Sequence, residues 1–350
     1  MKTISVHTNT PYDVLVERGI LNRCGELIRP LVKGEKCAII TDANVNALYA
    51  DRVTASLETN GFSVVKFVFP HGEGSKNAQT LLDIYAFLCE NEITRSDCLI
   101  ALGGGVVGDI TGFAAATFLR GMQYVQLPTS LLAQVDSSVG GKTAIDLKQG
   151  KNLVGAFKQP AVVLCDPDAL STLPEMFLSD GMGEVIKYGM IRDAALFDKL
   201  CTLDLQTVQA YFDEIIPTCI AIKRDVVDND PFDHGERMIL NFGHTLGHAI
   251  EAYYHYETYT HGSAVAAGMC LMTKYNGTQE QYDVLCACCE NYRLPTSVEA
   301  PLSELLPLCG GDKKRAGSML RYVVCTPTGT AEIRSVALKD FNALFEENRR

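Results

Sequence analysis

The chain has 350 residues, an apolar content of 47% and a formal net charge of −11. Its length exceeds the usual size of one hydrophobic core, so we expect two domains. The acidic charge argues against nucleic acid and anionic membranes as general partners, and the absence of both a long apolar run and a secretory signal predicts a cytoplasmic protein.

The first half of the chain alternates short apolar runs with helical patterns. The expected strands are residues 37–41, 64–69, 98–102, 124–127 and 162–165, and the helical patterns include 77–90 and 110–119. This alternation indicates βα units around a parallel sheet. We therefore predict a Rossmann-like α/β nucleotide-binding domain over residues 1–167.

Beyond residue 167 the alternation stops and helical patterns dominate. They cover residues 177–190, 204–227, 238–254, 262–275 and 280–291. We predict a mainly α-helical, metal- and substrate-binding domain over residues 168–350, with the active site between the two domains.

A glycine-rich segment follows the predicted strand at 98–102. The run Gly103-Gly104-Gly105-Val106-Val107-Gly108-Asp109 leads directly into an alanine-rich helical pattern. Glycines at such a turn let the backbone approach a pyrophosphate, whose charge the amides of a helix N-terminus stabilise. Gly103, Gly105 and Gly108 have the G-x-G-x-x-G spacing, but we do not interpret the segment as the Rossmann fingerprint of ordinary dehydrogenases or as a Walker A loop, and a tight turn alone would also use glycine. Its position between a buried strand and a helix favours dinucleotide binding.

Two other loops suit the same ligand. Asp42 and Asn44 follow a strand, where a carboxylate can accept hydrogen bonds from ribose hydroxyls, although a helix N-cap explains Asp42 equally well. The polar loop at 70–77 contains His71, Gly72, Glu73 and Lys76 and suits the adenosine end, although a solvated turn is equally plausible.

A third polar segment covers residues 128–143. It begins with Thr129 and Ser130, passes through an apolar stretch, and then carries Asp136, two serines, two glycines and Lys142. This composition indicates a loop that presents hydroxyl, carboxylate and ammonium groups to a polyhydroxylated ligand. A second glycine–lysine pair follows at residues 150–152.

Three later segments combine glycine with ionisable residues inside apolar, helix-favouring sequence. They are residues 183–189, 241–248 and 261–265, and they contain one glutamate and three histidines. Buried charge is costly unless it is paired or metal-bound. A carboxylate with two or three imidazoles is the ligand set of a catalytic zinc with one open position. His244 and His248 lie four residues apart and face one side of a helix, so spacing alone allows both to be ligands or to form a polar stripe.

These motifs resemble those of the 3-dehydroquinate synthase family over residues 42–321. The resemblance rests on Gly72-Glu73-x-x-Lys76, the glycine segment 103–109, residues 131–143, Lys151-Asn152-Leu153, Glu184-Val185-Ile186-Lys187-Tyr188-Gly189, Asn241-Phe242-Gly243-His244, His261-Gly262 and Asp312-Lys313-Lys314. His71, Asp146 and Asp233 depart from residues that are common in the family.

The resemblance implies a fold, a reaction and two cofactors. The implied enzyme is a carbon–oxygen lyase of the shikimate pathway, which leads to chorismate and the aromatic amino acids. It converts 3-deoxy-D-arabino-heptulosonate 7-phosphate to 3-dehydroquinate and phosphate by transient oxidation with NAD, phosphate elimination, reduction, ring opening and aldol closure. The resemblance also implies zinc or cobalt and a homodimer.

The resemblance further assigns residues to these roles. Glu184, His244 and His261 are the implied metal ligands, while His248 transfers protons and, with Asp233, Lys142 and Arg120, forms the catalytic set. The implied NAD-binding residues are Asp42, Asn44, His71, Gly72, Glu73, Lys76, Gly103, Gly104, Gly105, Val106, Val107, Gly108, Asp109, Thr129, Ser130, Asp136, Lys142, Lys151, Ala169, Leu170, Ser171 and Thr172. The implied substrate-binding residues are Arg120, Asp136, Lys142, Asn152, Lys187, Lys223, Arg237, Asn241, His248, Lys313 and Lys314. Without the resemblance, we would interpret Lys223 as an ordinary surface charge.

Three other functions share parts of this pattern. A metal-dependent NAD polyol dehydrogenase would release reduced cofactor, and another sugar phosphate cyclase would take a different sugar. A non-catalytic NAD-binding protein would turn over no sugar phosphate.

Overall fold

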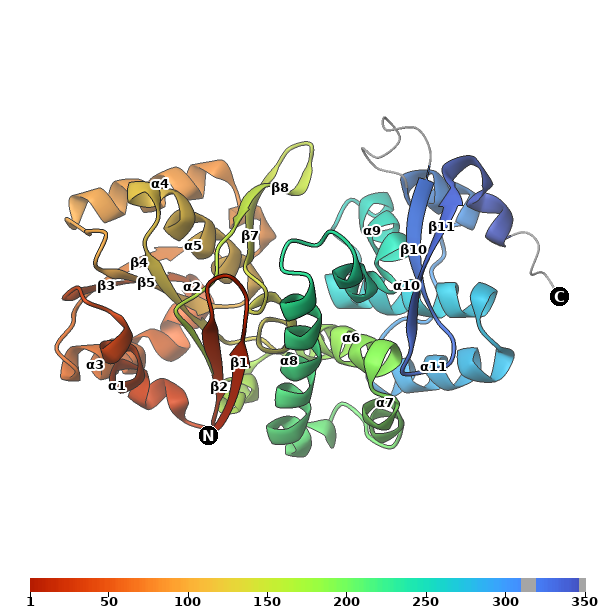
Figure 1. Cartoon of the computed structure of the whole chain (residues 1–350), viewed down its shortest axis with the longest axis horizontal. Helices are drawn as coiled ribbons and strands as arrows, with labels where there is room; N and C mark the ends of the chain where they lie inside the picture. Colours follow the sequence, from red (N-terminus) through yellow and green to blue (C-terminus); the bar gives the residue numbers. More distant parts are fainter. Residues whose placement is uncertain (310–318, 346–350) are drawn as a thin grey trace. The chain divides into compact units, whose positions relative to one another are not determined.

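The structure is a computed structural model that describes residues 1–309 and 319–345 (Figure 1). The chain packs into two compact units, Met1–Pro174 with Ile216–Phe232, and Glu175–Ile215 with Asp233–Arg350. The predicted division at residue 167 stays a prediction. Among the described residues, no helix combines the length and apolar character that a membrane crossing requires.

The first unit contains a seven-stranded sheet in the order β1-β2-β9-β6-β5-β3-β4. Its strands are β1 (Lys2–Val6), β2 (Tyr12–Val16), β3 (Lys36–Asp42), β4 (Ser63–Phe69), β5 (Cys98–Gly103), β6 (Gln123–Pro128) and β9 (Val162–Cys165). All neighbours pair in parallel except β1 and β2. The five predicted strands are confirmed, and the antiparallel β1–β2 hairpin was not predicted.

Helices cover both faces of this sheet because successive strand residues point to opposite sides. Cys37 and Ile39 of β3 belong to the core cluster under α1 (Cys24–Ile28) and α3 (Asp51–Thr59), whereas Ala38 and Ile40 belong to the cluster under α4 (Ala78–Glu90) and α5 (Gly105–Thr117). A one-turn helix, α2 (Ala43–Val45), follows β3. The continuous apolar runs seen in the sequence thus belong to strands that are buried on both faces.

The strand order creates a topological switch point between β3 and β5. The chain passes from β3 to β4 on one side and then returns to β5 on the other side. Leu102, near the end of β5, pairs with Thr41, near the end of β3. In open α/β sheets, ligands bind outside the carboxyl ends of the strands at such a point. Asp42 and Gly103 end these two strands.

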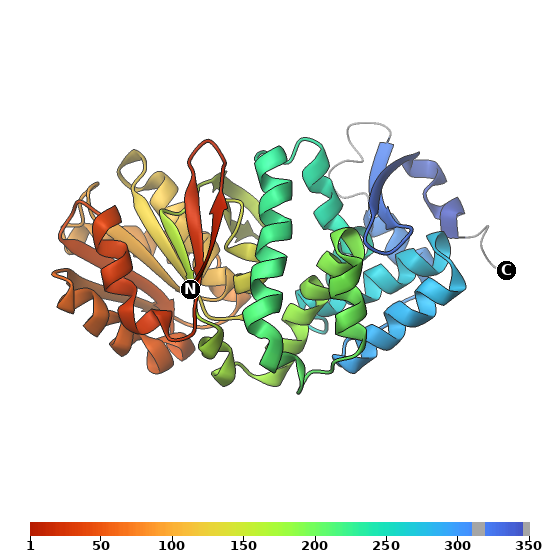
Figure 2. The ribbon, with the colours of Figure 1, turned by 60° about the horizontal axis from the view of Figure 1, so that its bottom comes forward.

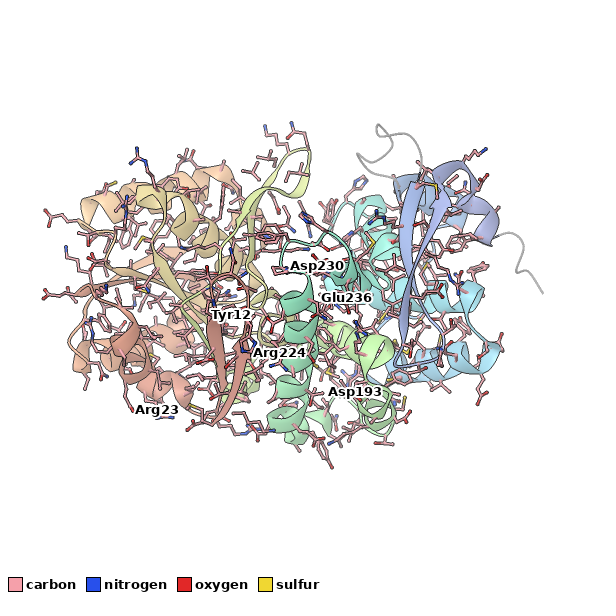
Figure 3. The ribbon with its side chains drawn as sticks, in the orientation of Figure 1. Tyr12, Arg23, Asp193, Arg224, Asp230 and Glu236 are labelled. Atoms are coloured by element: carbon pink, nitrogen blue, oxygen red, sulfur yellow. The ribbon has the colours of Figure 1, made fainter. Side chains whose placement is uncertain are left out.

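Two segments of the first unit differ from what the sequence predicted. Residues 133–137 form a short helical turn, whereas a loop was predicted, and they lead into the antiparallel hairpin of β7 (Lys142–Leu147) and β8 (Gly150–Phe157). From Ile216 onward, α8 (Phe212–Asn229) belongs to this unit and lies beside β1 (Figures 2 and 3). The backbone N–H of His7 donates to Asp228 Oδ1 at 2.7 Å, and Arg224 Nη1 donates to the Ser5 carbonyl at 3.3 Å.

The second unit is mainly helical, as predicted. Its helices are α6 (Glu175–Arg192), α7 (Ala194–Cys201), α9 (His244–Tyr253), α10 (His261–Asn276), α11 (Gln279–Asn291) and α12 (Leu302–Leu305), together with the first residues of α8. A hairpin of β10 (Met319–Cys325) and β11 (Ala331–Ala337) was not predicted.

The helix that was predicted over residues 238–254 is wrong in one respect, because it breaks before His244. Residues Glu236–Asn241 form a 3-10 helix, and Gly243 has a φ of +79° before α9 begins. A Cβ at Gly243 would lie 2.6 Å from the Val265 carbonyl oxygen of α10. Both the left-handed backbone and the close approach require glycine there. As a result, His244 becomes the first residue of α9.

Candidate active site

Three helices of the second unit bring the predicted metal ligands together. Glu184 comes from the middle of α6, and His244 and His261 are the first residues of α9 and α10. Glu184 Oε1 lies 3.5 Å from His244 Nε2 and 3.6 Å from His261 Nε2. Two ligands on one tetrahedral zinc, with bonds of about 2.1 Å, lie roughly 3.4 Å apart. The three side chains therefore fit a divalent metal.

The remaining atoms of these ligands support the same interpretation. Glu184 Oε1 is buried without a hydrogen-bond partner, while Oε2 accepts a hydrogen bond from Lys187 Nζ. Nδ1 of His244 lies 3.1 Å from the Phe242 carbonyl oxygen, so it donates a proton there and leaves Nε2 with a lone pair. Such outer partners fix the orientation of metal-binding imidazoles.

His261 has a carboxylate partner of the same kind. Its Nδ1 lies 3.5 Å from Oε1 of Glu251, which is buried in α9. Although burial disfavours the charged ring, the hydrogen bond to Glu251 and the charge of Glu184 raise the pKa of His261 to about 9. Burial, together with Lys187, His261 and His248, holds the pKa of His244 well below its usual value. Glu251 was not predicted from the sequence, although its position three residues after His248 places both on one helix face.

His248 lies beside this centre and is exposed. Its ring centroid is 5.4 Å from that of His244 and 6.0 Å from that of His261. His248, Glu251 and His261 form a second group whose ligand atoms lie close together. The Glu184 group differs in that its carboxylate Oε1 is buried without a hydrogen-bond partner and lies 3.5 and 3.6 Å from the two Nε2 atoms.

Lys187 is almost completely buried and lies one turn after Glu184 on α6. Burying an ammonium group is costly unless it is paired. Its Nζ donates to Glu184 and lies 4.7 Å from the centroid of the Tyr188 ring. The lysine therefore holds a fixed positive charge beside the metal-ligand set.

The predicted cofactor-binding loops gather at the carboxyl end of the sheet in the first unit. Asp42 Oδ1 accepts hydrogen bonds from the backbone N–H groups of Asn44 and Val45 at 2.9 and 3.0 Å, so Asp42 is the N-cap of α2. Gly104 is the N-cap residue of α5 and supplies no side chain there. A Cβ at Gly104 would meet only Ser130, with its Oγ at 3.3 Å.

Lys76 joins three of the predicted segments. Its buried Nζ donates to Asp109 Oδ2 at 2.6 Å and to Asn152 Oδ1 at 2.5 Å, and it lies 3.9 Å from Glu73 Oε1. Burial raises the pKa of Asp109, and Lys76 opposes this effect. The loop 70–77, the start of α5 and the β7–β8 hairpin are thus tied together by one ammonium group.

The other predicted nucleotide residues occupy several environments. Ala169 and Leu170 are buried in the 3-10 helix Pro167–Thr172, where the Ala169 carbonyl accepts a hydrogen bond from the Tyr49 hydroxyl at 2.8 Å. Val107 and Thr129 are buried, Gly103 is buried at the end of β5, and His71, Gly72 and Ser171 are exposed.

The predicted substrate residues lie in both units. In the first, Lys223 is buried and its Nζ lies 3.0 Å from Asp136 Oδ1, so the surface-charge interpretation is wrong. In the second, Arg237 is buried and Asn241 is half-buried. Arg120, Lys142 and Asn152 are exposed, Lys151 and Asp233 are half-buried, and Lys313 and Lys314 lie outside the described residues.

Two family models match consecutive segments of the chain. The family model described as 3-dehydroquinate synthase N-terminal matches residues 66–180, and the one described as 3-dehydroquinate synthase C-terminal matches residues 181–315. A 3-dehydroquinate synthase of Clostridium acetobutylicum is 47% identical over 97% of this chain and 98% of its own. Another, of Clostridium botulinum, is 48% identical over 94% and 96%.

Solved structures with the same fold are more distant in sequence. A 2-deoxy-scyllo-inosose synthase complexed with carbaglucose-6-phosphate, NAD+ and Co2+ has a TM-score of 0.87 and 22% identity, with 99% of each chain covered. A 2-epi-5-epi-valiolone synthase from Streptomyces hygroscopicus, with NAD+ and Zn2+ bound, has a TM-score of 0.86 and 23% identity, with 99% of this chain and 98% of that chain covered.

Proposed function

The chain belongs to the 3-dehydroquinate synthase family, and on this premise we propose how its own residues convert 3-deoxy-D-arabino-heptulosonate 7-phosphate to 3-dehydroquinate and phosphate. The observation that carries the proposal is the convergence of Glu184 Oε1 and two histidine Nε2 atoms at 3.5 and 3.6 Å within the matching segments. The dehydrogenase and other cyclase alternatives are not favoured by relatives at 47 and 48% identity that carry the synthase name.

Glu184, His244 and His261 hold the divalent metal, zinc or cobalt. When bound, this ion supplies Lewis acidity to a substrate hydroxyl, and NAD supplies hydride acceptance and return. The protein contributes the orientation of the ligands: the Phe242 carbonyl and Glu251 fix the two imidazole rings by their Nδ1 atoms.

NAD occupies the switch point between β3 and β5. Asp42 lies at the end of β3, and the glycine segment 103–109 begins at the end of β5. The N-terminus of α5 carries no side-chain cap, so its amides suit a pyrophosphate. Lys76 holds Asp109 and the neighbouring hairpin in place around this segment. The remaining loop residues given above complete the nucleotide site.

The substrate carries a carboxylate and a phosphate, so its site needs several cations. Lys187 and Arg237 in the second unit and Arg120, Lys142, Lys151 and Lys223 in the first provide them. The Asp136 carboxylate, with Oδ1 at 3.0 Å from Lys223 Nζ, offsets the cost of burying that ammonium group. Asn152 and Asn241 add hydrogen bonds, and Lys313 and Lys314 complete the set.

His248 transfers protons at the substrate and is not a metal ligand. It lies beside the ligand histidines but is exposed, which suits a group that exchanges protons. Asp233, which lies four residues before Arg237 in the sequence, belongs to the same catalytic set. The enzyme acts in the cytoplasm as a homodimer.

Phosphate release from the heptulosonate phosphate tests this function. We expect release that requires both NAD and the metal, with no net accumulation of NADH, because the hydride returns to the product. A matched reaction with glucose 6-phosphate serves as the control. Net NADH formation would indicate a dehydrogenase, and preferential use of glucose 6-phosphate would indicate a different cyclase.

A further inference from the structure

The helix that begins with His261 takes its N-terminal cap from another helix. Thr260 stands at the N-cap position of α10 but makes no side-chain hydrogen bond to the helix backbone. Instead, Asp180 Oδ1 accepts hydrogen bonds from the backbone N–H groups of Gly262 at 2.6 Å and Ser263 at 3.2 Å. These donors would otherwise lack intrahelical partners.

Asp180 lies one turn before Glu184 on α6, so its side chain and that of Glu184 share one helix face. The residue that it caps is the neighbour of His261. One buried carboxylate therefore links the two helices that supply two of the three metal ligands. A negative charge at this point also suits the positive end of the α10 dipole.

We propose that Asp180 is a positioning residue of the metal centre, which holds His261 at its 3.6 Å separation from Glu184 through the first turn of α10. This inference rests on the proposed assignment of Glu184, His244 and His261 as metal ligands. Its role is indirect, because Asp180 touches the backbone beside a ligand and not the metal itself. Loss of such an outer partner typically weakens metal binding about 10- to 100-fold.

The test compares zinc affinity among variants of the full chain, measured by competition with a chromogenic chelator. D180A removes the acceptor, and D180N keeps one acceptor oxygen while losing the charge. The matched control is D193A, because Asp193 Oδ1 accepts from the Leu196 N–H at 2.9 Å and caps α7, which carries no proposed metal ligand (Figure 3). The visible spectrum of the cobalt-loaded protein reports coordination geometry independently of activity.

We expect D180A to weaken zinc binding about 10- to 100-fold and to alter the cobalt spectrum. D180N should retain most of the parent's zinc affinity, and D193A should bind zinc as tightly as the parent. Zinc binding by D180A within about twofold of the parent would overturn the proposal. Equal losses in D180A and D193A, or in D180A and D180N, would overturn it as well. H244A in the same assay separates the two hypotheses: if it keeps zinc, the ligand assignment itself fails, whereas if it alone loses zinc, only the role of Asp180 fails.

Discussion

Gly262→Ala tests whether the contact between α6 and α10 sets the metal geometry. A Cβ at Gly262 would lie 1.8 Å from the backbone oxygen of Asp180, and an ordinary contact begins at 3.4 Å. A backbone oxygen cannot rotate away, so the helices must separate by about 1.6 Å. If α6 and α10 separate along the line of this contact, the 3.6 Å distance between Glu184 Oε1 and His261 Nε2 increases to roughly 5 Å. Two ligands with zinc bonds of about 2.1 Å cannot lie more than roughly 4.2 Å apart.

The substitution should therefore remove one ligand from the metal. We expect zinc affinity to fall by more than about 100-fold, because the loss of an outer partner alone costs 10- to 100-fold. The free energy of unfolding without metal should fall by about 1–3 kcal/mol from overpacking, partly offset by about 1 kcal/mol from the higher helix propensity of alanine. Chelator competition measures the affinity, and denaturant unfolding in EDTA measures the stability.

Gly189→Ala provides the control on α6. Its Cβ would lie 2.9 Å from the Cβ and 3.0 Å from the backbone Cα and N of Phe197 in α7, so the required shift is smaller and acts at the contact between α6 and α7. We expect this variant to bind zinc as tightly as the parent. Parental zinc affinity in Gly262→Ala would refute the reasoning, because the helix contact would then not determine the ligand separation.

Three other predictions follow from the site. Chelation should abolish activity and added zinc or cobalt should restore it, so active protein without a stoichiometric ion in elemental analysis would contradict the metal assignment. His248→Ala should keep near-stoichiometric zinc but lose turnover by about 100-fold or more, whereas His244→Ala should lose both; loss of zinc in His248→Ala would make that residue a ligand. Gly104→Leu should weaken NAD binding with little change in thermal stability, because a Cβ at Gly104 would meet only Ser130; unchanged affinity in calorimetry would place the nucleotide elsewhere.

The parallel sheet was predictable because its strands are buried on both faces. Such strands are continuous apolar runs between helical patterns, and β3 and β5 were found with errors of one residue at their ends. The candidate metal ligands were recognisable as a group for a related reason, because glutamate and histidine inside apolar helices need partners. The choice of His261 instead of His248 came from the family resemblance, and the structure brings Glu184, His244 and His261 together.

The hairpins and the burial of Lys223 were not predictable from local sequence. A two-stranded hairpin such as β10–β11 has a short, weak alternation, and its stability depends on packing against the rest of its unit. Lys223 lies among charged neighbours in sequence, and only the packing of α8 with the first unit brings Asp136 to its ammonium group. Likewise, the break before α9 depends on the approach of Gly243 to Val265, which are 22 residues apart.

Two of the proposed metal ligands, His244 and His261, are the first residues of helices, so the helix dipoles affect the charge balance of the centre. The positive ends of α9 and α10 both act at His244 and His261, and they oppose the binding of any cation. Glu184, Asp180 and Glu251 offset this potential from buried positions. If Glu184, His244 and His261 hold the ion, however, the helix ends and Lys187 would add to its positive charge and favour an anionic ligand beside it. Inorganic phosphate, which is also a product of the reaction, should therefore compete with substrate at this centre more strongly than a neutral sugar of the same size.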